Sequence, residues 1–261
     1  MNTCDTIGQV IVVKVGGNEI DDDSFLAELV AAVKAISEQS NVVVVHGGGK
    51  EIADLHGRLG VPFDFVEGLR VTSFDSLRLV KMVLSGAVNT RVTRWLVNGG
   101  VNALGLSGVD LGLIRVQPLR PRGVDIGYVG KVVEVRVEKL WALLDAGIVP
   151  VVSPLSLGVD GQSYNVNADQ VAAALAASLE AEQLVFVSNV PGVMLDSWDS
   201  MPVSELTAQQ VEGHVAEGRI NGGMVPKVRS ASEAVMNGVH QAVITDIAGL
   251  RSGRGTAVVV G

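Results

Sequence analysis

The sequence predicts an α/β fold, a three-layer α/β/α sandwich with an open, mostly parallel central sheet. Short β-branched runs alternate along the chain with longer segments of helical periodicity. Strands that alternate with helices are joined by right-handed crossovers, which gives a mostly parallel sheet with helices on both faces. Hydrophobic residues make up 48% of the 261 residues, enough for a substantial core. Several strands end in glycine, and ligands of such sheets bind at the carboxyl ends of the strands.

The first part of the chain supplies two strands that end in glycine and three helices. Residues 10–15 are a β-branched run typical of a buried strand. Residues 21–37 have apolar positions at helical spacing, behind three Asp and a Ser that can cap the helix. Residues 42–45 predict the next strand and 51–59 a short helix. A wide apolar stripe over 73–98, with a glycine inside it, predicts a longer helix.

The middle of the chain is predicted to be richer in strands. Residues 101–106 and 148–152 are apolar runs of strand length, separated by a short helix at 140–145. Apolar and polar residues alternate over 132–137, as in one arm of a hairpin. The glycines and turn formers of 157–162 are the best place for a boundary between two lobes.

The last part of the chain repeats the alternation of strands and helices. An Ala-rich helix is predicted at 168–179, and a buried strand follows at 184–187. The periodicity of the remaining residues predicts helices at 207–217 and 227–236 and strands at 242–245 and 257–260.

The charge balance argues against two classes of partner. The chain carries 28 acidic and 20 basic residues, a formal net charge of -8. Binding to nucleic acid or to an anionic membrane surface needs clustered Lys and Arg, so we expect neither. An anionic substrate must then be held by a locally positive site that opposes the overall charge of the protein.

The single cysteine and the short apolar runs favour a cytoplasmic protein. Cys4 is the only cysteine in the sequence, which excludes an intramolecular disulfide and a zinc site built from cysteines. The longest apolar runs are too short to span a bilayer. The first residues lack the basic and apolar regions of a signal peptide.

Two strand ends carry the pattern of a phosphate-binding site. Lys14 is followed after one residue by Gly16 and Gly17, so an ammonium group lies beside bare backbone NH groups, and phosphate oxygens need both. The alternative is a strand-end lysine that points to solvent. His46 precedes the triple glycine 47–49, which lets a ligand approach the main chain, although a flexible turn fits the same pattern. We interpret His46 as a packed or hydrogen-bonded residue.

Two further segments point to a carboxylate-bearing ligand and to polar groups beside it. Arg70, in Gly-Leu-Arg-Val-Thr, offers a planar fork that pairs bidentately with a carboxylate, although a lone arginine is more often a surface residue. Asn165, Asn167 and Asp169 alternate ahead of the Ala-rich helix. Asn167 is a good helix cap, and three polar residues in register are more than a cap needs.

The last segment, Gly-Gly-Met-Val-Pro-Lys at 222–227, places a second lysine at the start of a helix. Pro226 suits the first helical turn. A cation is unfavourable at this end of a helix, so Lys227 is understandable there if a phosphate occupies the same spot. The alternative is a solvated first-turn lysine.

Taken in order, these segments resemble the amino acid kinase family over about residues 11–256. Each segment alone is weak evidence, whereas the ordered set is specific. Residues 68–72, 165–169 and 104–110 resemble the branch of the family that acts on N-acetylglutamate. The resemblance implies ATP-dependent phosphorylation of the side-chain carboxylate of N-acetyl-L-glutamate, a step of arginine biosynthesis. It also implies Mg²⁺ that is held mainly by phosphates and water, with no metal ligands from the protein.

The resemblance further implies two lobes and a role for each site residue. Residues 1–160 would bind the acyl-amino acid and form a homodimer through the helix 73–98, and residues 161–261 would bind ATP. The implied catalytic residues are Lys14, Lys227 and Asp169, with Asp169 orienting both lysines. The implied substrate-binding residues are Gly48, Gly49, Arg70, Asn165 and Asn167. The implied nucleotide-binding residues are Gly16, Gly17, Ser188, Asn189, Gly192, Arg219, Gly222 and Gly223.

The sequence departs from the family pattern at several positions. Asn189 stands where the nucleotide loop usually carries Asp, and Lys50 follows the triple glycine where Pro is common. The usual Asp-Gly-Arg near the last strands is Asp-Ile-Ala at 246–248. Because Lys14 lies close to the start of the chain, we expect a dimer without the N-terminal helix of arginine-inhibited hexameric members.

Three alternatives remain at this point. One is a related kinase that acts on glutamate or aminoadipate attached to an acidic carrier protein, and it would need a basic docking surface. Another is a non-catalytic amino-acid or nucleotide sensor on the same fold, against which the retention of Lys14, Asp169 and Lys227 speaks. The third is a plain metabolite-binding scaffold.

Overall fold

A computed structural model describes residues 8–17, 19–195 and 201–261, so Cys4 lies outside the described residues. The strands are β1 (Val10–Val15), β2 (Asn41–His46), β3 (Phe65–Val66), β4 (Leu69–Arg70), β5 (Ala103–Gly108), β6 (Ile114–Pro118), β7 (Gly130–Val135), β8 (Val149–Gly158), β9 (Ser163–Asn165), β10 (Gln183–Val187), β11 (Glu205–Thr207), β12 (Gln241–Thr245) and β13 (Thr256–Val259).

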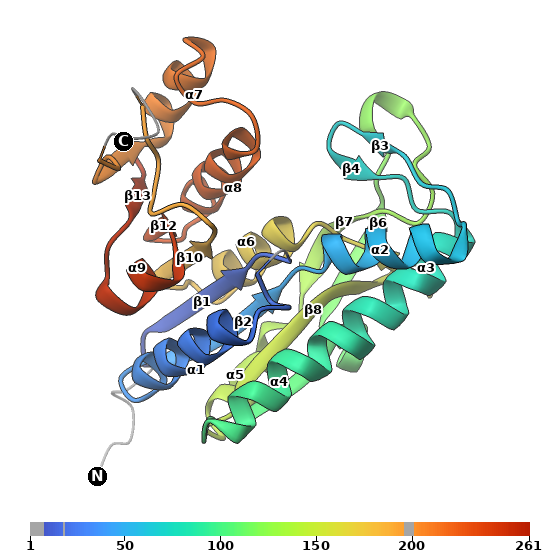
Figure 1. Cartoon of the computed structure of the whole chain (residues 1–261), viewed down its shortest axis with the longest axis horizontal. Helices are drawn as coiled ribbons and strands as arrows, with labels where there is room; N and C mark the ends of the chain where they lie inside the picture. The colour runs from blue at the N-terminus through green and yellow to red at the C-terminus, as the bar shows by residue number, and fades with distance from the viewer. Residues whose placement is uncertain (1–7, 18, 196–200) are drawn as a thin grey trace.

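The helices alternate with these strands over most of the chain (Figure 1). They are α1 (Asp23–Ser37), α2 (Gly49–Leu59), α3 (Phe74–Lys81), the π-helical segment η1 (Met82–Val88), α4 (Asn89–Asn98), α5 (Val137–Leu144), α6 (Ala168–Ser178), α7 (Ala208–Ala216), α8 (Met224–Met236) and α9 (Ile247–Ser252), with short 3₁₀ turns at Asp110–Gly112 and Pro121–Gly123. Among the described residues, none of these helices has both the length and the apolar character of a membrane span.

The central sheet confirms the predicted fold class. Its strand order is β11-β13-β12-β10-β1-β2-β8-β6-β7, and β5 and β9 also pair with β8. The central pairs β10·β1, β1·β2 and β2·β8 are parallel. Antiparallel pairing occurs between β12 and β13, between β6 and β7, and between β8 and β9.

Helices cover both faces of the sheet, and each face has its own core. One hydrophobic cluster joins the sheet to α5, α6, α7 and α8, and the other joins it to α1, α2, α9 and the long helix α3–η1–α4. Neighbouring residues of β1 separate accordingly, with Val12 in the first cluster and Val13 in the second. This alternation is that of a strand buried on both faces.

The predicted helix at 73–98 is one long helix with an irregular middle. Ser73 caps it, accepting a hydrogen bond from the backbone NH of Ser76 at 3.2 Å. The π-helical segment contains Gly86, the glycine inside the apolar stripe. π-Helical turns are rare and often lie at functional sites. This one places Leu84 against the glycine loop that follows β2.

Several short elements were not predicted from the sequence. They are the β3–β4 hairpin, the strands β6, β9 and β11, and the helix α9. The predicted hairpin arm at 132–137 is β7, and its partner is β6. The stretch 157–162 forms the end of β8 and its turn into β9, closed by a hydrogen bond from the Gly158 NH to the Gln162 carbonyl at 2.7 Å.

Candidate active site

The site lies where three neighbouring parallel strands end. Val15, the last residue of β1, is in register with His46 at the end of β2 and with Val187 at the end of β10. The loops that follow therefore emerge at the same edge of the sheet, as expected for parallel strands. The Gly47 NH donates to the Val15 carbonyl at 3.1 Å and joins two of these loops.

Two glycines are required by the close approach of these loops. A Cβ atom on Gly17 would lie 2.6 Å from the Gly48 nitrogen and 2.8 Å from the Gly49 nitrogen. A Cβ atom on Gly48 would lie 2.7 Å from Cδ2 of Leu84. No side chain fits at either position unless the loops or the helix move, so the backbone NH groups stay open to a ligand.

The loops enclose a central cavity of about 310 Å³. It brings together predicted site residues that are far apart in the sequence. They are Lys14, Gly16, Gly17, Gly48, Gly49, Arg70, Asn165, Asn167, Ser188, Asn189 and Lys227. The cavity thus collects both predicted lysines and all five predicted substrate-binding residues.

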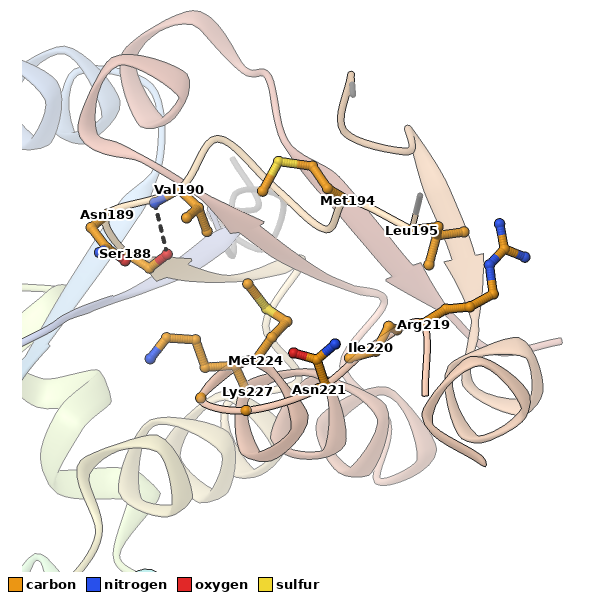
Figure 2. A pocket seen from close by; sticks show the side chains of 12 residues that line it. Ser188, Asn189, Val190, Met194, Leu195, Arg219, Ile220, Asn221, Met224 and Lys227 are labelled. Carbon is orange, nitrogen blue, oxygen red and sulfur yellow. Dashed lines mark hydrogen bonds between the residues drawn. The ribbon is translucent and has the colours of Figure 1, made fainter. Parts of the chain in front are cut away.

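A second, outer cavity of about 460 Å³ adjoins the central one (Figure 2). The two share Ser188, Asn189 and Lys227 in their linings. The remaining predicted residues in the outer lining are Arg219, Gly222 and Gly223. Figure 2 shows the Lys227 side chain on one side of this cavity, with Ser188 and Asn189 across from it. A ligand that spans both cavities must therefore pass Lys227.

Gly192 is the one predicted nucleotide-binding residue outside both linings. A Cβ atom at this position would lie 2.6 Å from Oγ1 of Thr256 and 2.7 Å from Cβ of Pro202. Its φ angle of 157° is accessible mainly to glycine. Gly192 thus packs the loop after β10 against its neighbours.

Lys14 is held by a nearly buried ion pair. Its Nζ lies 2.6 Å from Oδ1 of Asp169, and the two side chains are 8% and 13% exposed. Asp169 is in the first turn of α6, where Asn167 caps the helix by accepting from the Asp169 NH at 2.8 Å. The predicted cap is confirmed. Buried charges need such partners, because leaving one unpaired is costly.

Lys227 faces the same space from α8, and its charge is not fully balanced. Burial, and after it the repulsion from Lys14, lower the pKa of Lys227 below its ordinary value, while Asp169 and Glu19 oppose the shift. The Lys14 and Lys227 ammonium groups are therefore close enough to repel each other. Asp169 forms its ion pair with Lys14, so an anion between the two lysines would relieve their repulsion.

Three helices begin at these cavities. The first residues of α2 and α6 line the central cavity, and the start of α8 lines the outer one. Neither Gly48 nor Gly223, the residues that precede α2 and α8, offers a side chain to cap its helix. At α6 the Asn167 side chain already accepts from the Asp169 and Gln170 NH groups, and at α8 the Met224 and Val225 NH groups donate to the Asn221 and Gly222 carbonyls at 3.3 Å. The uncapped start of α2 and the positive ends of the three helix dipoles favour phosphate groups.

Two polar residues from separate strands line the central cavity, Arg70 from β4 and Asn165 from β9. Nη2 of Arg70 donates to the Gly49 carbonyl at 3.2 Å, whereas Nη1 is buried without a hydrogen-bond partner. Burial lowers the pKa of Arg70. Nδ2 of Asn165 donates to Oγ1 of Thr72 at 3.2 Å. An unpaired buried guanidinium nitrogen is suited to a carboxylate ligand.

His46 is a structural residue, as predicted. It is fully buried, and its Nδ1 lies 2.9 Å from the Gly47 carbonyl. Nδ2 of Asn89, on α4, lies 3.0 Å from Nε2 of His46 and 2.8 Å from the Val151 carbonyl. An amide nitrogen only donates, so Nε2 accepts and Nδ1 carries the proton. Burial lowers the pKa of His46 to about 4, which keeps the ring neutral.

Several lining residues were not anticipated from the sequence, among them one carboxylate and one leucine. Glu19 brings a carboxylate to the central cavity from the loop after β1, and Leu84 reaches it from the π-helical segment. The sequence signal for Glu19 was its place two residues after the Lys-x-Gly-Gly pattern. Leu84 had no separate signal, because it belongs to the same apolar stripe as its core neighbours.

The departures from the family pattern have local partners in the structure. Lys50 pairs with Asp21 across the start of α2 at 2.5 Å. Asp246 caps α9 by accepting from the Gly249 NH at 2.7 Å. Asn189 lines both cavities, where its side chain is open to a ligand.

Comparison with known proteins agrees with this geometry. The model of the amino acid kinase family matches residues 9–246. The chain belongs to the amino acid kinase family. A relative named acetylglutamate kinase, from Chloroflexus aggregans (strain MD-66 / DSM 9485), is 48% identical over 249 residues, which cover 95% of each chain. A second protein of that name, from Methanopyrus kandleri, is 45% identical and covers 95% of this chain and 99% of its own.

Two solved structures share this fold. N-acetylglutamate synthase from Neisseria gonorrhoeae, complexed with coenzyme A and N-acetyl-glutamate, is 25% identical with a TM-score of 0.85, over 97% of this chain and 60% of that one. Carbamate kinase from Giardia lamblia bound to AMP-PNP is 15% identical with a TM-score of 0.72, over 98% and 99%.

Proposed function

We propose that this protein transfers the γ-phosphoryl group of ATP to the side-chain carboxylate of N-acetyl-L-glutamate, giving N-acetylglutamyl 5-phosphate and ADP. This reaction is a step of arginine biosynthesis. The observation that carries the proposal is that Lys14 and Lys227, far apart in the chain, line one cavity beside glycine NH groups. The choice of acceptor rests on the relatives named acetylglutamate kinase, at 44–49% identity.

The reaction needs positioning and neutralisation of charge more than proton transfer. A carboxylate is already ionised at neutral pH, so its oxygen attacks the γ-phosphorus without a general base. The bond between that phosphorus and the β,γ-bridging oxygen breaks, and ADP leaves with the electron pair. Negative charge spreads over the transferring group, and fixed cations stabilise it.

Lys14 and Lys227 supply this stabilisation in the proposed reaction. Lys14 is fixed by Asp169, and the repulsion between the two ammonium groups is relieved once an anion lies between them. The NH groups of Gly16, Gly17 and Gly48 add donors that need no reorganisation during the reaction.

Arg70, Asn165, Asn167, Gly48 and Gly49 form the proposed acceptor site. The free Nη1 of Arg70 receives a carboxylate of the acceptor. Asn165 offers an amide beside it, and the start of α2 adds backbone NH groups. Together these groups bind an acceptor that carries a second carboxylate besides the one that reacts.

The proposed nucleotide site is the outer cavity. Its lining comes entirely from residues 188–227, which agrees with an ATP-binding lobe at 161–261. Most of the central lining comes from residues before 160, which agrees with an acceptor-binding lobe at 1–160. Ser188, Asn189, Arg219, Gly222 and Gly223 are the proposed nucleotide contacts.

Mg²⁺ fits this site as a companion of ATP. The described part of the chain has no group of three or more His, Cys, Asp or Glu side chains that could hold a metal ion. Mg²⁺ commonly keeps waters and uses phosphate oxygens as ligands, so ATP itself would hold it, with Glu19 and Asp169 as the nearby carboxylates. Bound in this way, the metal neutralises phosphate charge.

The proposed assembly is a homodimer in the cytoplasm, formed through the helix α3–η1–α4. The proposal follows the family resemblance, and this helix leaves Met82 and Val97 57% and 50% exposed and so available to a partner chain. Light scattering on Met82→Glu tests the pairing. A shift to monomer is expected, and an unchanged mass would contradict this interface.

A hydroxamate-trapping assay tests the proposed reaction. Acyl phosphates react with hydroxylamine, so the protein is incubated with ATP, Mg²⁺ and each of N-acetyl-L-glutamate, L-glutamate, N-acetyl-L-aspartate and carbamate. The expected result is hydroxamate with N-acetyl-L-glutamate alone, and its loss in Lys14→Ala and Lys227→Ala. Hydroxamate formed with another acceptor, or no hydroxamate with any of the four, would refute the assignment.

A further inference from the structure

We propose that Phe63 and Phe65 form an aromatic clamp that positions Arg70 for the acceptor carboxylate. The inference rests on the proposed function and adds two positioning residues to its acceptor site. Phe63 is absent from the lining of the central cavity, so it acts through Arg70 alone, whereas Phe65 lines the cavity and can also contact the acceptor.

Both rings lie against the Arg70 guanidinium. Its Cζ is 4.1 Å from the ring centroid of Phe63 and 4.9 Å from that of Phe65. Both distances are within the range of about 6 Å for an attraction between a cation and a ring face. The rings also contact each other edge to face, at 5.8 Å and 83°. The two aromatic rings therefore define one position for the guanidinium group.

The clamp is anchored in buried structure on its far side. Phe63 packs edge to face on the His56 ring, at 4.8 Å and 72°. His56 is 1% exposed, and its two ring nitrogens lie 2.9 Å from the Val61 carbonyl and 3.1 Å from Oγ of Ser76. Phe65 is held by the hairpin itself, because it pairs with Arg70 across β3 and β4.

The rings themselves have no role in the two hydrophobic cores. Phe63 and Phe65 are 37% and 52% exposed, and neither belongs to the core clusters. A single exposed phenylalanine is ordinary, but two on one guanidinium fix its direction. With Nη2 bound to the Gly49 carbonyl, the clamp leaves the buried Nη1 as the free donor of a cavity-lining arginine.

Steady-state kinetics of Phe63→Leu, Phe65→Leu and the double variant test the clamp. Leucine keeps the apolar character and removes the ring face. We expect KM for N-acetyl-L-glutamate to rise about threefold per ring and about tenfold for both. We expect kcat and KM for ATP to stay within about twofold, because the phosphoryl site is separate. Phe63→Tyr keeps the ring and should retain the wild-type KM.

Two further variants separate positioning from structure. Phe74→Leu removes a similarly exposed ring that contacts Tyr128, and it should leave KM unchanged. In an Arg70→Met background Phe63→Leu should change KM by less than about 1.5-fold, because positions that act through one another are not additive. The clamp would be overturned if the rise in KM were as large in the Arg70→Met background as in the wild type. It would also be overturned if the clamp variants lowered kcat in parallel, or if they left KM unchanged in the wild type.

These outcomes differ from a failure of the proposed function itself. Wild-type enzyme without activity on N-acetyl-L-glutamate would refute the function. Active wild-type enzyme whose KM ignores the loss of both rings would refute only the clamp.

Discussion

Replacing Asp169 by Asn tests the ion pair that holds Lys14. The change removes one charge and keeps nearly the same shape. The two charges lie 2.6 Å apart, and at an effective dielectric constant of about 20 their gross attraction is about 6 kcal/mol. Desolvation offsets much of this. Removing one partner of a buried pair costs about 3–5 kcal/mol, and the adjacent cavity admits water, so we expect about 3 kcal/mol.

The expected effect on catalysis follows from the same geometry. Without its partner, the Lys14 ammonium loses its fixed position beside the γ-phosphate, so kcat should fall about a hundredfold, as on removal of one preorganised charge-stabilising group. Urea unfolding measures the stability and the coupled hydroxamate assay measures kcat. If kcat falls less than about threefold and the unfolding midpoint is unchanged, Asp169 neither stabilises the fold nor fixes Lys14 for catalysis.

Glu212→Gln is the matched control. Glu212 pairs with Arg229 at 3.0 Å, but these side chains are 55% and 52% exposed and lie outside both cavities. An exposed pair contributes about 0–1 kcal/mol. The Glu212→Gln variant should therefore keep kcat and lose little stability. The comparison separates the loss of an ion pair in general from the loss of the pair between Lys14 and Asp169.

Three other perturbations have definite expected outcomes. Lys227→Met should lower kcat about a hundredfold and leave the unliganded protein at least as stable, because it removes a buried cation beside Lys14. The kinetic assay measures kcat and urea unfolding measures stability, and a marked loss of stability would contradict this prediction. The pKa of Lys227 is lowered in the folded protein. Between this lowered pKa and the ordinary pKa of lysine the unfolded chain binds more protons than the folded one, so stability rises with pH there, while activity, which needs the ammonium, falls. A pH–rate profile checks this, and in Asp169→Asn its alkaline limb should move to lower pH. Gly17→Ala should lower kcat at least tenfold by forcing the loops apart, whereas Gly57→Ala, with nothing within 4 Å of its Cβ, should not.

The sequence was sufficient for the fold class, for the central strands of the sheet and for much of the candidate site. β1 and β2 are β-branched runs with glycines directly behind them, and parallel strands bring their ends together. Lys14, at the end of one such strand, could be expected at that edge. Lys227 could be placed at the start of a helix by Pro226, but only the topology shows that this helix begins beside Lys14.

The β3–β4 hairpin was not predictable, and the aromatic clamp depends on it. Each strand has two residues, too few for a visible alternation. The turn has positive φ at Glu67 and Gly68, which Asn-Gly or Asp-Gly usually signals. Glutamate at the first of these positions hides that signal. Phe63 consequently had no sign of its contact with Arg70.

The π-helical segment could not be read from the sequence for a different reason. Residues 73–98 have the apolar stripe of an ordinary helix, and the π-helical segment within them packs against the glycine loop after β2. A Cβ on Gly48 would meet Leu84, Val88 and Val83, all from this segment.

The most direct test of the account is a crystal structure with MgADP, a fluoroaluminate ion and N-acetyl-L-glutamate. The ion replaces the transferring phosphoryl group. We expect the Nζ atoms of Lys14 and Lys227 to lie on opposite sides of it, each at hydrogen-bond distance of about 3 Å from a fluoride. A complex in which either lysine points away from the ion would contradict the claim that the two act on one phosphoryl group.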